Sequence, residues 1–166
     1  MIIQYENIKL NVEQLSEFDP SKKTILFLHG FTGSAHDWKD VAQKIDRRFN
    51  KTALDLIGHG KSSSPASVSY YITDALVAQI EQVINHLRLK DIILCGYSMG
   101  GRVALNFAIA KPNMVKGLIL ESSSAGIKNE KEREARKKSD EELAAYLENN
   151  SIEDFVAMWL DQELFG

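Results

Sequence analysis

The sequence of 166 residues predicts an α/β fold in which a mostly parallel sheet carries helices on both faces. Short apolar runs, of the kind that a strand buried on both faces requires, alternate with stretches whose apolar residues recur at helical spacing. A glycine-flanked turn at residues 96–101 leads directly from one such run into one such stretch, which indicates a strand, a sharp turn and a helix. Together these observations favour parallel strands joined by crossover helices.

The N-terminal part predicts an antiparallel edge followed by the first parallel unit. Residues 2–15 alternate weakly and suit one or two short antiparallel strands, whereas residues 24–28 form a continuous apolar run typical of a buried parallel strand. Ser34 suits the N-cap of the next helix, with Asp37 three residues on. The expected apolar stripe of that helix is Trp38, Val41, Ala42 and Ile45.

The rest of the chain continues the alternation and then changes character. Further core elements are expected at residues 51–56 (strand), 72–87 (helix), 92–95 (strand), 102–111 (helix) and 115–120 (strand). From residue 129 a charged helical pattern runs over 130–148, and another helix is expected from residue 152 to about 164, with Ser151 and Asp154 as its capping pair. We therefore divide the chain into the N-terminal part of a core, 1–128, and the start of a helical lid, 129–166.

Composition places the chain in the ordinary globular class. It is 44% hydrophobic and 26% charged, with a net charge of −3 that argues against a general nucleic-acid or membrane-surface role. We expect a cytoplasmic protein, because no basic and apolar leader and no long apolar run is present. The single cysteine, Cys95, excludes an intrachain disulfide and a thiolate metal cluster, and is expected to be a small buried hydrophobe.

Ser98 lies at the centre of the G-x-S-x-G pattern from Gly96 to Gly100, which is typical of a nucleophile elbow. A serine hydroxyl near its free pKa is a weak nucleophile or base and needs a histidine that is oriented by a carboxylate. In this architecture those partners follow the serine, yet all four histidines of the chain precede it. The sequence therefore predicts a catalytic serine without the rest of its triad.

Two further segments, the loop after residue 28 and the segment that starts at Asp55, are also candidates for a role at the site. In folds of this kind, the loop after the first parallel strand and the residue after the serine each supply one oxyanion-hole amide, so the backbone N–H groups of Phe31 and Met99 are the candidates. The D-x-x-G-H-G-x-S segment that starts at Asp55 contains His59. Both residues are expected to hold this loop together rather than to perform chemistry.

Arg102 suits a carboxylated substrate, whereas the residues around Arg136 favour a solvated helix face. Arg102 lies one turn into the helix that follows the elbow, where a guanidinium is close to the serine. Arg136 lies in the charged segment 128–136, and runs of this kind are usually solvated helix faces with i,i+4 ion pairs.

The motifs as a set resemble the 2-succinyl-6-hydroxy-2,4-cyclohexadiene-1-carboxylate synthases, menaquinone-pathway lyases of the α/β-hydrolase superfamily. The resemblance is carried by residues 29–34, 55–62, 96–105 and 118–122, by Glu132, Arg133, Arg136 and Asp140, and by Phe155 and Trp159. It implies elimination of pyruvate from a small polycarboxylate substrate without a metal or organic cofactor. It also implies that Ser98 acts as the base, that Tyr97 lines the site, and that Arg102, Arg136 and Trp159 bind the substrate.

The chain departs from that family at its end. Family members continue past the lid with strands that bring the triad aspartate and histidine, so we expect the N-terminal portion of such a lyase, inactive alone. Its partner is expected to be a C-terminal fragment or a second copy that completes the sheet beside residues 115–120, an apolar open edge. Two alternatives stay open: an esterase or C–C hydrolase of the same fold, and a non-catalytic ligand-binding module.

Overall fold

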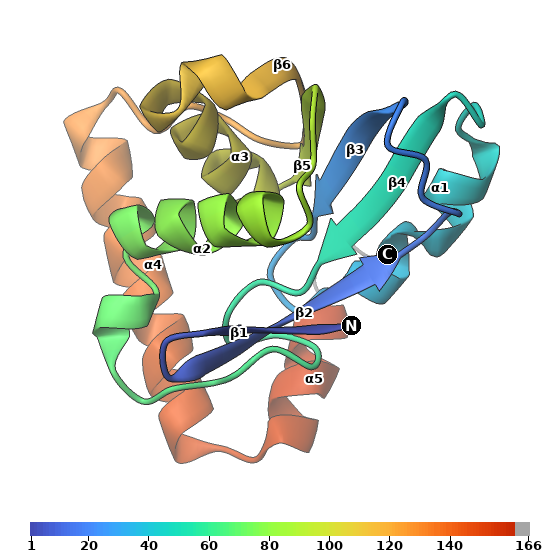
Figure 1. Cartoon of the computed structure of the whole chain (residues 1–166). Helices are drawn as coiled ribbons and strands as arrows, with labels where there is room; N and C mark the ends of the chain where they lie inside the picture. The colour runs from blue at the N-terminus through green and yellow to red at the C-terminus, as the bar shows by residue number, and fades with distance from the viewer. Residues whose placement is uncertain (162–166) are drawn as a thin grey trace. The chain divides into compact units, whose positions relative to one another are not determined.

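A computed structural model describes residues 1–161 and contains a mixed sheet with the strand order β1-β2-β4-β3-β5-β6 (Figure 1). The short N-terminal strands pair antiparallel, and the four later strands run parallel to one another, which confirms the predicted fold class. The strands are β1 (Ile2–Tyr5), β2 (Ile8–Gln14), β3 (Lys23–Leu28), β4 (Phe49–Leu54), β5 (Ile92–Tyr97) and β6 (Val115–Glu121).

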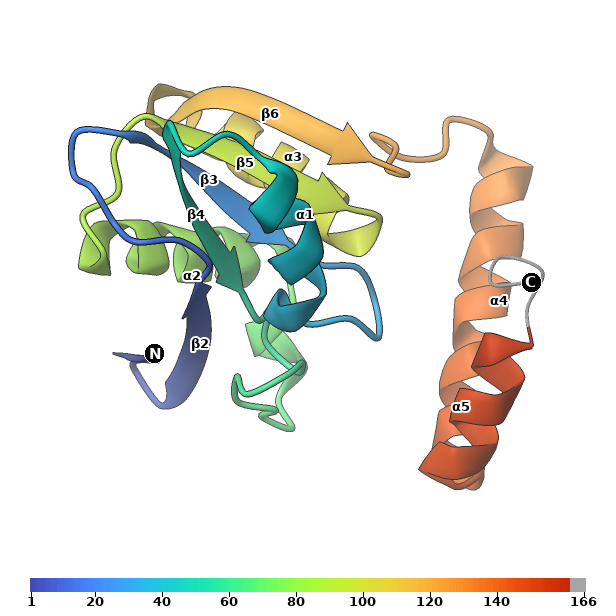
Figure 2. The same cartoon turned by 90° about the vertical axis from the view of Figure 1, so that its right-hand side faces the viewer.

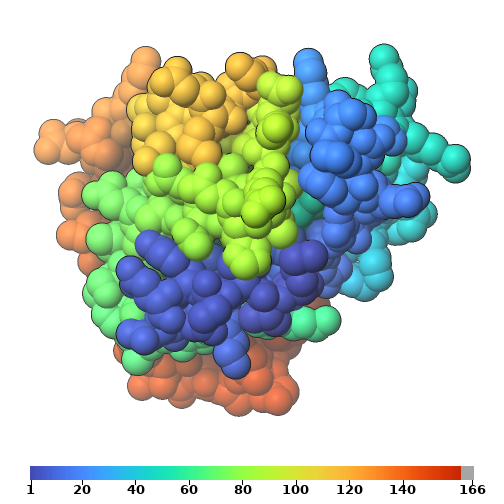
Figure 3. All heavy atoms as spheres, in the orientation of Figure 1, coloured from blue at the N-terminus to red at the C-terminus, as the bar shows by residue number. Residues whose placement is uncertain are grey.

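Helices cover both faces of the sheet, as the turned view in Figure 2 shows. The α-helices of this part are α1 (Lys39–Lys44), α2 (Thr73–His86) and α3 (Met99–Ala110), and the 3-10 helices are η1 (Ala35–Trp38), η2 (Val68–Tyr70) and η3 (Pro112–Met114). Both α2 and α3 pack on one face, and η1 with α1 packs on the other. In the space-filling view of Figure 3, the N-terminal strands (dark blue) lie directly against the α2 segment (green).

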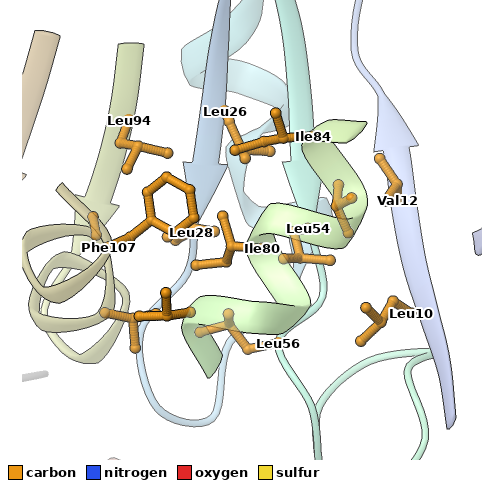
Figure 4. Close-up of a cluster of buried hydrophobic side chains, with 14 of the residues drawn as sticks. Leu10, Val12, Leu26, Leu28, Leu54, Leu56, Ile80, Ile84, Leu94 and Phe107 are labelled. Carbon is orange, nitrogen blue, oxygen red and sulfur yellow. The ribbon is translucent and has the colours of Figure 1, made fainter. Parts of the chain in front are cut away.

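The central strands separate two hydrophobic cores, and successive side chains along each strand lie alternately in one core and in the other. On the α2 and α3 side, Leu26, Leu28, Leu54 and Leu94 meet Phe107 in a fully buried cluster (Figure 4). On the α1 side, the intervening residues Ile25, Phe27, Ala53 and Cys95 meet Trp38, whose ring centroid lies 4.8 Å from that of Phe27. This alternation is what a strand buried on both faces requires.

Two local predictions were wrong. The fourth strand spans Phe49–Leu54 rather than residues 51–56, because Phe49 pairs with Lys23 of β3 and the backbone N–H of Leu56 donates to a side chain instead of a strand. Val41 is 44% exposed, although it was expected in the apolar stripe. The segment begins as the 3-10 helix η1, which has three residues per turn, so the stripe keeps Trp38, Ala42 and Ile45 and loses Val41.

The chain divides into two compact units, Met1–Ala125 and a second that begins at Gly126, just before the predicted boundary. The second unit contains α4 (Glu130–Asn149) and α5 (Ile152–Leu160). Asn129 caps α4 by accepting from the backbone N–H of Glu132, and Ser151 caps α5 by accepting from that of Asp154 at 3.1 Å, as the sequence predicted. The predicted end of the last helix, near residue 164, lies outside the described residues. That these units are a core and a lid stays a prediction.

No helix among residues 1–161 is long and apolar enough to cross a membrane.

β6 is the last strand in the order of the sheet and pairs, within the described part of the chain, with β5 alone. Its apolar residues Ile119 and Leu120 are 49% and 39% exposed. A parallel edge of this kind presents unpaired backbone groups beside apolar side chains, which is a template for association.

We predict that the 166-residue chain associates through β6 at micromolar concentration, and that Ile119→Lys weakens this association because a charge on an edge strand opposes pairing. Sedimentation velocity measures the self-association of both the unmodified chain and the variant. The matched control is Ile109→Lys, which places the same charge on the outer face of α3, where Ile109 is 71% exposed. A monomer throughout this range with a single cooperative melt would contradict the prediction and favour a binding module that folds alone.

Candidate functional site

Ser98 lies between β5 and α3 in a backbone conformation that serine rarely adopts. Its φ of 50° and ψ of −112° place it at positive φ, where only glycine is unstrained. The chain folds back so tightly here that a Cβ on Gly96 would lie 2.5 Å from the carbonyl oxygen of Gly100 and from Cα of Gly101. The structure therefore has the strand, sharp turn and helix of a nucleophile elbow, as the sequence predicted.

The loop after β3 lies against this elbow. A Cβ on Gly100 would overlap the carbonyls of Leu28 and His29, so α3 approaches the end of β3 backbone to backbone. A Cβ on Gly30 would lie 2.8 Å from Cδ1 of Tyr97 and 3.6 Å from Cβ of Ser98. Phe31 and Met99 were predicted to supply the oxyanion-hole amides. Phe31 follows Gly30, which lies close to Ser98, and Met99 follows Ser98 itself. Their role as donors stays a prediction.

His29 is a buried bridge that sequence reasoning did not identify. Its Nε2 accepts from the backbone N–H of Leu56 at 3.0 Å, so its Nδ1 carries the proton and donates to the carbonyl of Gly30 at 2.8 Å. Burial lowers the pKa of His29 below its ordinary value, and the ring of His59, 5.0 Å away between centroids, acts in the same direction. Nε2 therefore joins the end of β3 to the loop after β4, and Nδ1 holds the neighbouring carbonyl of Gly30.

Asp55 anchors the far end of the loop after β3, at Ala35. Its buried carboxylate accepts hydrogen bonds from the backbone N–H groups of Ala35 and Lys61 and from the side chain of Asn11. Burial alone would raise the pKa of Asp55, but these hydrogen bonds together hold it below its ordinary value. Gly60, at φ 54°, leaves the space that the carboxylate occupies. These contacts confirm that Asp55 holds this loop together.

The predicted substrate-binding residues fall in both units. Tyr97 and Arg102 lie in the first, on either side of Ser98, and the N–H of Arg102 donates to the carbonyl of Ser98 at 3.1 Å. Arg136 lies in α4, where its Nε donates to Asp140 at 2.8 Å. Trp159 lies in α5 and stacks on Phe155, with ring centroids 5.7 Å apart. The structure thus brings together Phe31, Tyr97, Ser98, Met99 and Arg102, and describes Arg136 and Trp159 within their own unit.

No histidine within residues 1–161 forms a hydrogen bond with the hydroxyl of Ser98, since His29 is engaged with Gly30 and Leu56 and His59 with the carbonyl of Ile57. The described part of the chain also gathers no group of three or more His, Cys, Asp or Glu side chains that could hold a metal ion. Cys95 is buried as predicted, and burial, together with the charge of Glu121, raises its pKa to about 11. That thiol is therefore protonated and unreactive at neutral pH.

The sheet and the Ser98 elbow identify the class of protein to which the chain belongs. The chain belongs to the α/β-hydrolase fold family, whose pattern matches residues 23–160. Within it, the chain is a homologue of the 2-succinyl-6-hydroxy-2,4-cyclohexadiene-1-carboxylate synthases. The predicted resemblance is thereby confirmed.

Three similar proteins illustrate the relationship. A candidate synthase of this name from Bacillus subtilis is 36% identical over 147 residues, which are 88% of this chain and 53% of that protein. The synthase of Klebsiella pneumoniae is 32% identical over 89% of this chain and 57% of its own length. The structure of MenH from S. aureus matches with a TM-score of 0.81 and 31% identity, over 94% of this chain and 57% of that one. The chain spans about half the length of the curated relatives it matches.

We predict a pH-dependent contribution of His29 to stability. Because its folded-state pKa is lowered from 6.5, this contribution is complete above pH 6.5 and is lost as the pH falls from there through the folded-state pKa. His29→Ala should cost about 1–3 kcal/mol at pH 7.5, since the buried N–H of Leu56 loses its acceptor, and should flatten the pH dependence below 6.5. Urea unfolding at several pH values measures both effects.

His36→Ala is the control for this experiment, because His36 is exposed and forms no side-chain hydrogen bond within the described residues. If His29→Ala kept the pH dependence of the unmodified chain, His29 would not be its source.

Proposed function

We propose that this chain is the N-terminal, serine-bearing portion of a lyase that eliminates pyruvate from 2-succinyl-5-enolpyruvyl-6-hydroxy-3-cyclohexene-1-carboxylate. The product would be 2-succinyl-6-hydroxy-2,4-cyclohexadiene-1-carboxylate, an intermediate of menaquinone biosynthesis. The observation that carries the proposal is the strained Ser98 elbow with Arg102 on the same first turn of helix, in a chain homologous to synthases of this reaction.

The proposed chemistry is a proton abstraction followed by loss of a leaving group. The hydroxyl of Ser98, activated by a histidine, takes a proton from the substrate ring. The electrons of that C–H bond form a ring double bond, and the bond between the ring carbon and the enolpyruvyl oxygen breaks. The enolate of pyruvate that leaves takes up a proton at its methylene carbon and becomes pyruvate. Negative charge that develops on the substrate would be stabilised by the N–H groups of Phe31 and Met99, beside the serine. No acyl-enzyme is needed.

Arg102 would hold one substrate carboxylate. The backbone N–H of Arg102 donates a hydrogen bond to the carbonyl of Ser98. The Arg102 side chain therefore starts one helical turn from the Ser98 hydroxyl. The residue is exposed, and within the described part of the chain its guanidinium forms no ion pair. A guanidinium suits carboxylate binding because it can donate two parallel hydrogen bonds.

Arg136 and Trp159 would complete recognition from the second unit. Arg136 offers a second guanidinium for a substrate with several carboxylates, and Trp159 offers an aromatic surface for its ring.

Activity would depend on residues that supply the histidine and the carboxylate of the triad. We propose that these come from a C-terminal segment like that of the relatives, of which the matched part covers only 53% and 57%. Such a segment would also pair with β6, which among the described residues pairs with β5 alone.

We predict that the 166-residue chain alone releases pyruvate from this substrate on the order of 10⁴-fold more slowly than the same chain assembled with the C-terminal half of the Klebsiella relative, because the serine alone lacks its base. Coupled detection of pyruvate measures the rates. Ser98→Ala should abolish the gain.

Three outcomes would contradict the lyase proposal. Pyruvate release by the chain alone at a rate typical of enzymes, with no second polypeptide detected by mass, would show that no further residues are needed. A burst of chromophore from an ester substrate without pyruvate release would favour an esterase. Saturable binding of the polycarboxylate without turnover in the assembled protein would favour a binding module.

We further predict that Arg102→Ala and Arg136→Ala each lower kcat/KM of the assembled protein by about 10- to 150-fold. This corresponds to a loss of about 1.5–3 kcal/mol of transition-state stabilisation, the value of a hydrogen bond to a charged group. Matched controls are Lys116→Ala, at the opposite end of the sheet, and Lys137→Ala, a neighbouring cation of α4 that also has an i,i+4 partner. These controls should change kcat/KM little. An unchanged kcat/KM in Arg136→Ala would mean that this face of α4 is only solvated.

A further inference from the structure

The last residue of β6 and the segment that follows it hold the backbone of Ser98 at two points. The N–H of Ser98 donates to the carbonyl of Glu121 at 2.9 Å. The hydroxyl of Ser123 donates to the carbonyl of Ser98 at 2.7 Å and lies 3.2 Å from that of Glu121. Both polar backbone groups of the strained serine are thus bonded to residues 121–123, in addition to the bond that Arg102 makes within the helix.

Ser123 packs against Gly101, in the first turn of α3. A Cβ on Gly101 would overlap the hydroxyl of Ser123, lie 2.7 Å from its Cβ and lie 2.8 Å from the carbonyl of Gly96. Ser123 is half-buried in the space that Gly101 leaves. The hydroxyl therefore has a defined place beside the elbow rather than a chance contact on a free surface.

The carbonyl of Ser98 belongs to the same peptide group as the N–H of Met99. A peptide group is planar, with its C=O and N–H pointing in opposite directions, so an atom that fixes the carbonyl also fixes the direction of the N–H. The Met99 N–H is the predicted oxyanion donor next to the serine. The strained φ of Ser98 makes such external support necessary, since conformations of this kind persist only when their surroundings hold them.

We propose that Ser123 is a positioning residue for the reactive centre: through the carbonyl of Ser98, its hydroxyl sets the orientation of the Met99 N–H and holds the elbow. The part that concerns the oxyanion donor rests on the proposed function. The geometry itself is independent of the reaction that Ser98 performs, and the tests below require no turnover.

A thiol in place of the Ser98 hydroxyl reports on this geometry. In Ser98→Cys, the new thiol lies at the N-terminus of α3, where helix N–H groups lower a thiol pKa below the free value of about 8.5. Alkylation with iodoacetamide across pH gives this pKa as a midpoint. Cys95 serves as an internal monitor of unfolding, because it is buried and its pKa is raised to about 11.

We expect that adding Ser123→Ala to Ser98→Cys raises the midpoint by about 0.3–0.7 pH units, the size of a helix-terminus effect that is partly lost. Ser124→Ala, an exposed neighbour without a side-chain hydrogen bond within the described residues, should leave the midpoint unchanged. An unchanged midpoint in the Ser123→Ala variant would overturn the proposal. So would faster labelling of Cys95 in step with position 98, which would assign Ser123 to overall stability.

Hydrogen exchange provides a second measurement in the chain with Ser98 intact. Ser123→Ala should speed exchange of the Ser98 amide, which donates to Glu121, by about three- to tenfold, as expected for the loss of one supporting hydrogen bond. The amides of Leu26 and Leu94, in the buried centre of the sheet, should be unaffected. Equal acceleration at all three amides, or none at Ser98, would contradict a local positioning role.

Discussion

The close approach of backbone to backbone around Ser98 is the constraint on which the rest of the structure depends. Gly100 allows α3 to start against the carbonyls of Leu28 and His29 at distances that no side chain would permit. Gly96 and Gly101 allow the end of β5 to approach the first turn of α3 equally closely. That contact sets how α3 lies on the sheet, and so which residues of α3 reach α2 and the buried cluster around Phe107. A single methyl group at any of these glycines would displace the serine, the loop after β3 and one wall of the core together.

Beneath the elbow, polar side chains replace part of the apolar core. Asp55 and His29 are almost fully buried, and each is satisfied by backbone groups from loops that have no regular secondary structure. A buried polar group costs little when every partner is present and much when one is lost, so this network specifies one loop conformation more sharply than apolar packing would. The hydrogen bonds of His29, after β3, and Asp55, after β4, thus order the loops at the site.

The sequence predicted features that repeat and missed those that depend on distant contacts. Apolar runs and helical spacing located the central strands and helices, and the glycines around Ser98 located the elbow, because these patterns are local. The 3-10 start of the first helix moved Val41 out of its expected stripe, and the roles of His29 and Ser123 depend on partners far along the chain. Ser123 stands among three consecutive serines, and only the path of β6 distinguishes it from its neighbours.

The pairing of Arg136 with Asp140 has a consequence for any anion that approaches α4. The guanidinium already has a carboxylate one turn along the helix, so a ligand does not fill an empty position but exchanges with a resident group. An exposed i,i+4 pair contributes only about 0.2–0.5 kcal/mol, which a ligand carboxylate in a bidentate contact can exceed. Asp140 is thus a weak competitor, which lowers the affinity of an incoming anion for this guanidinium by about a factor of two at most.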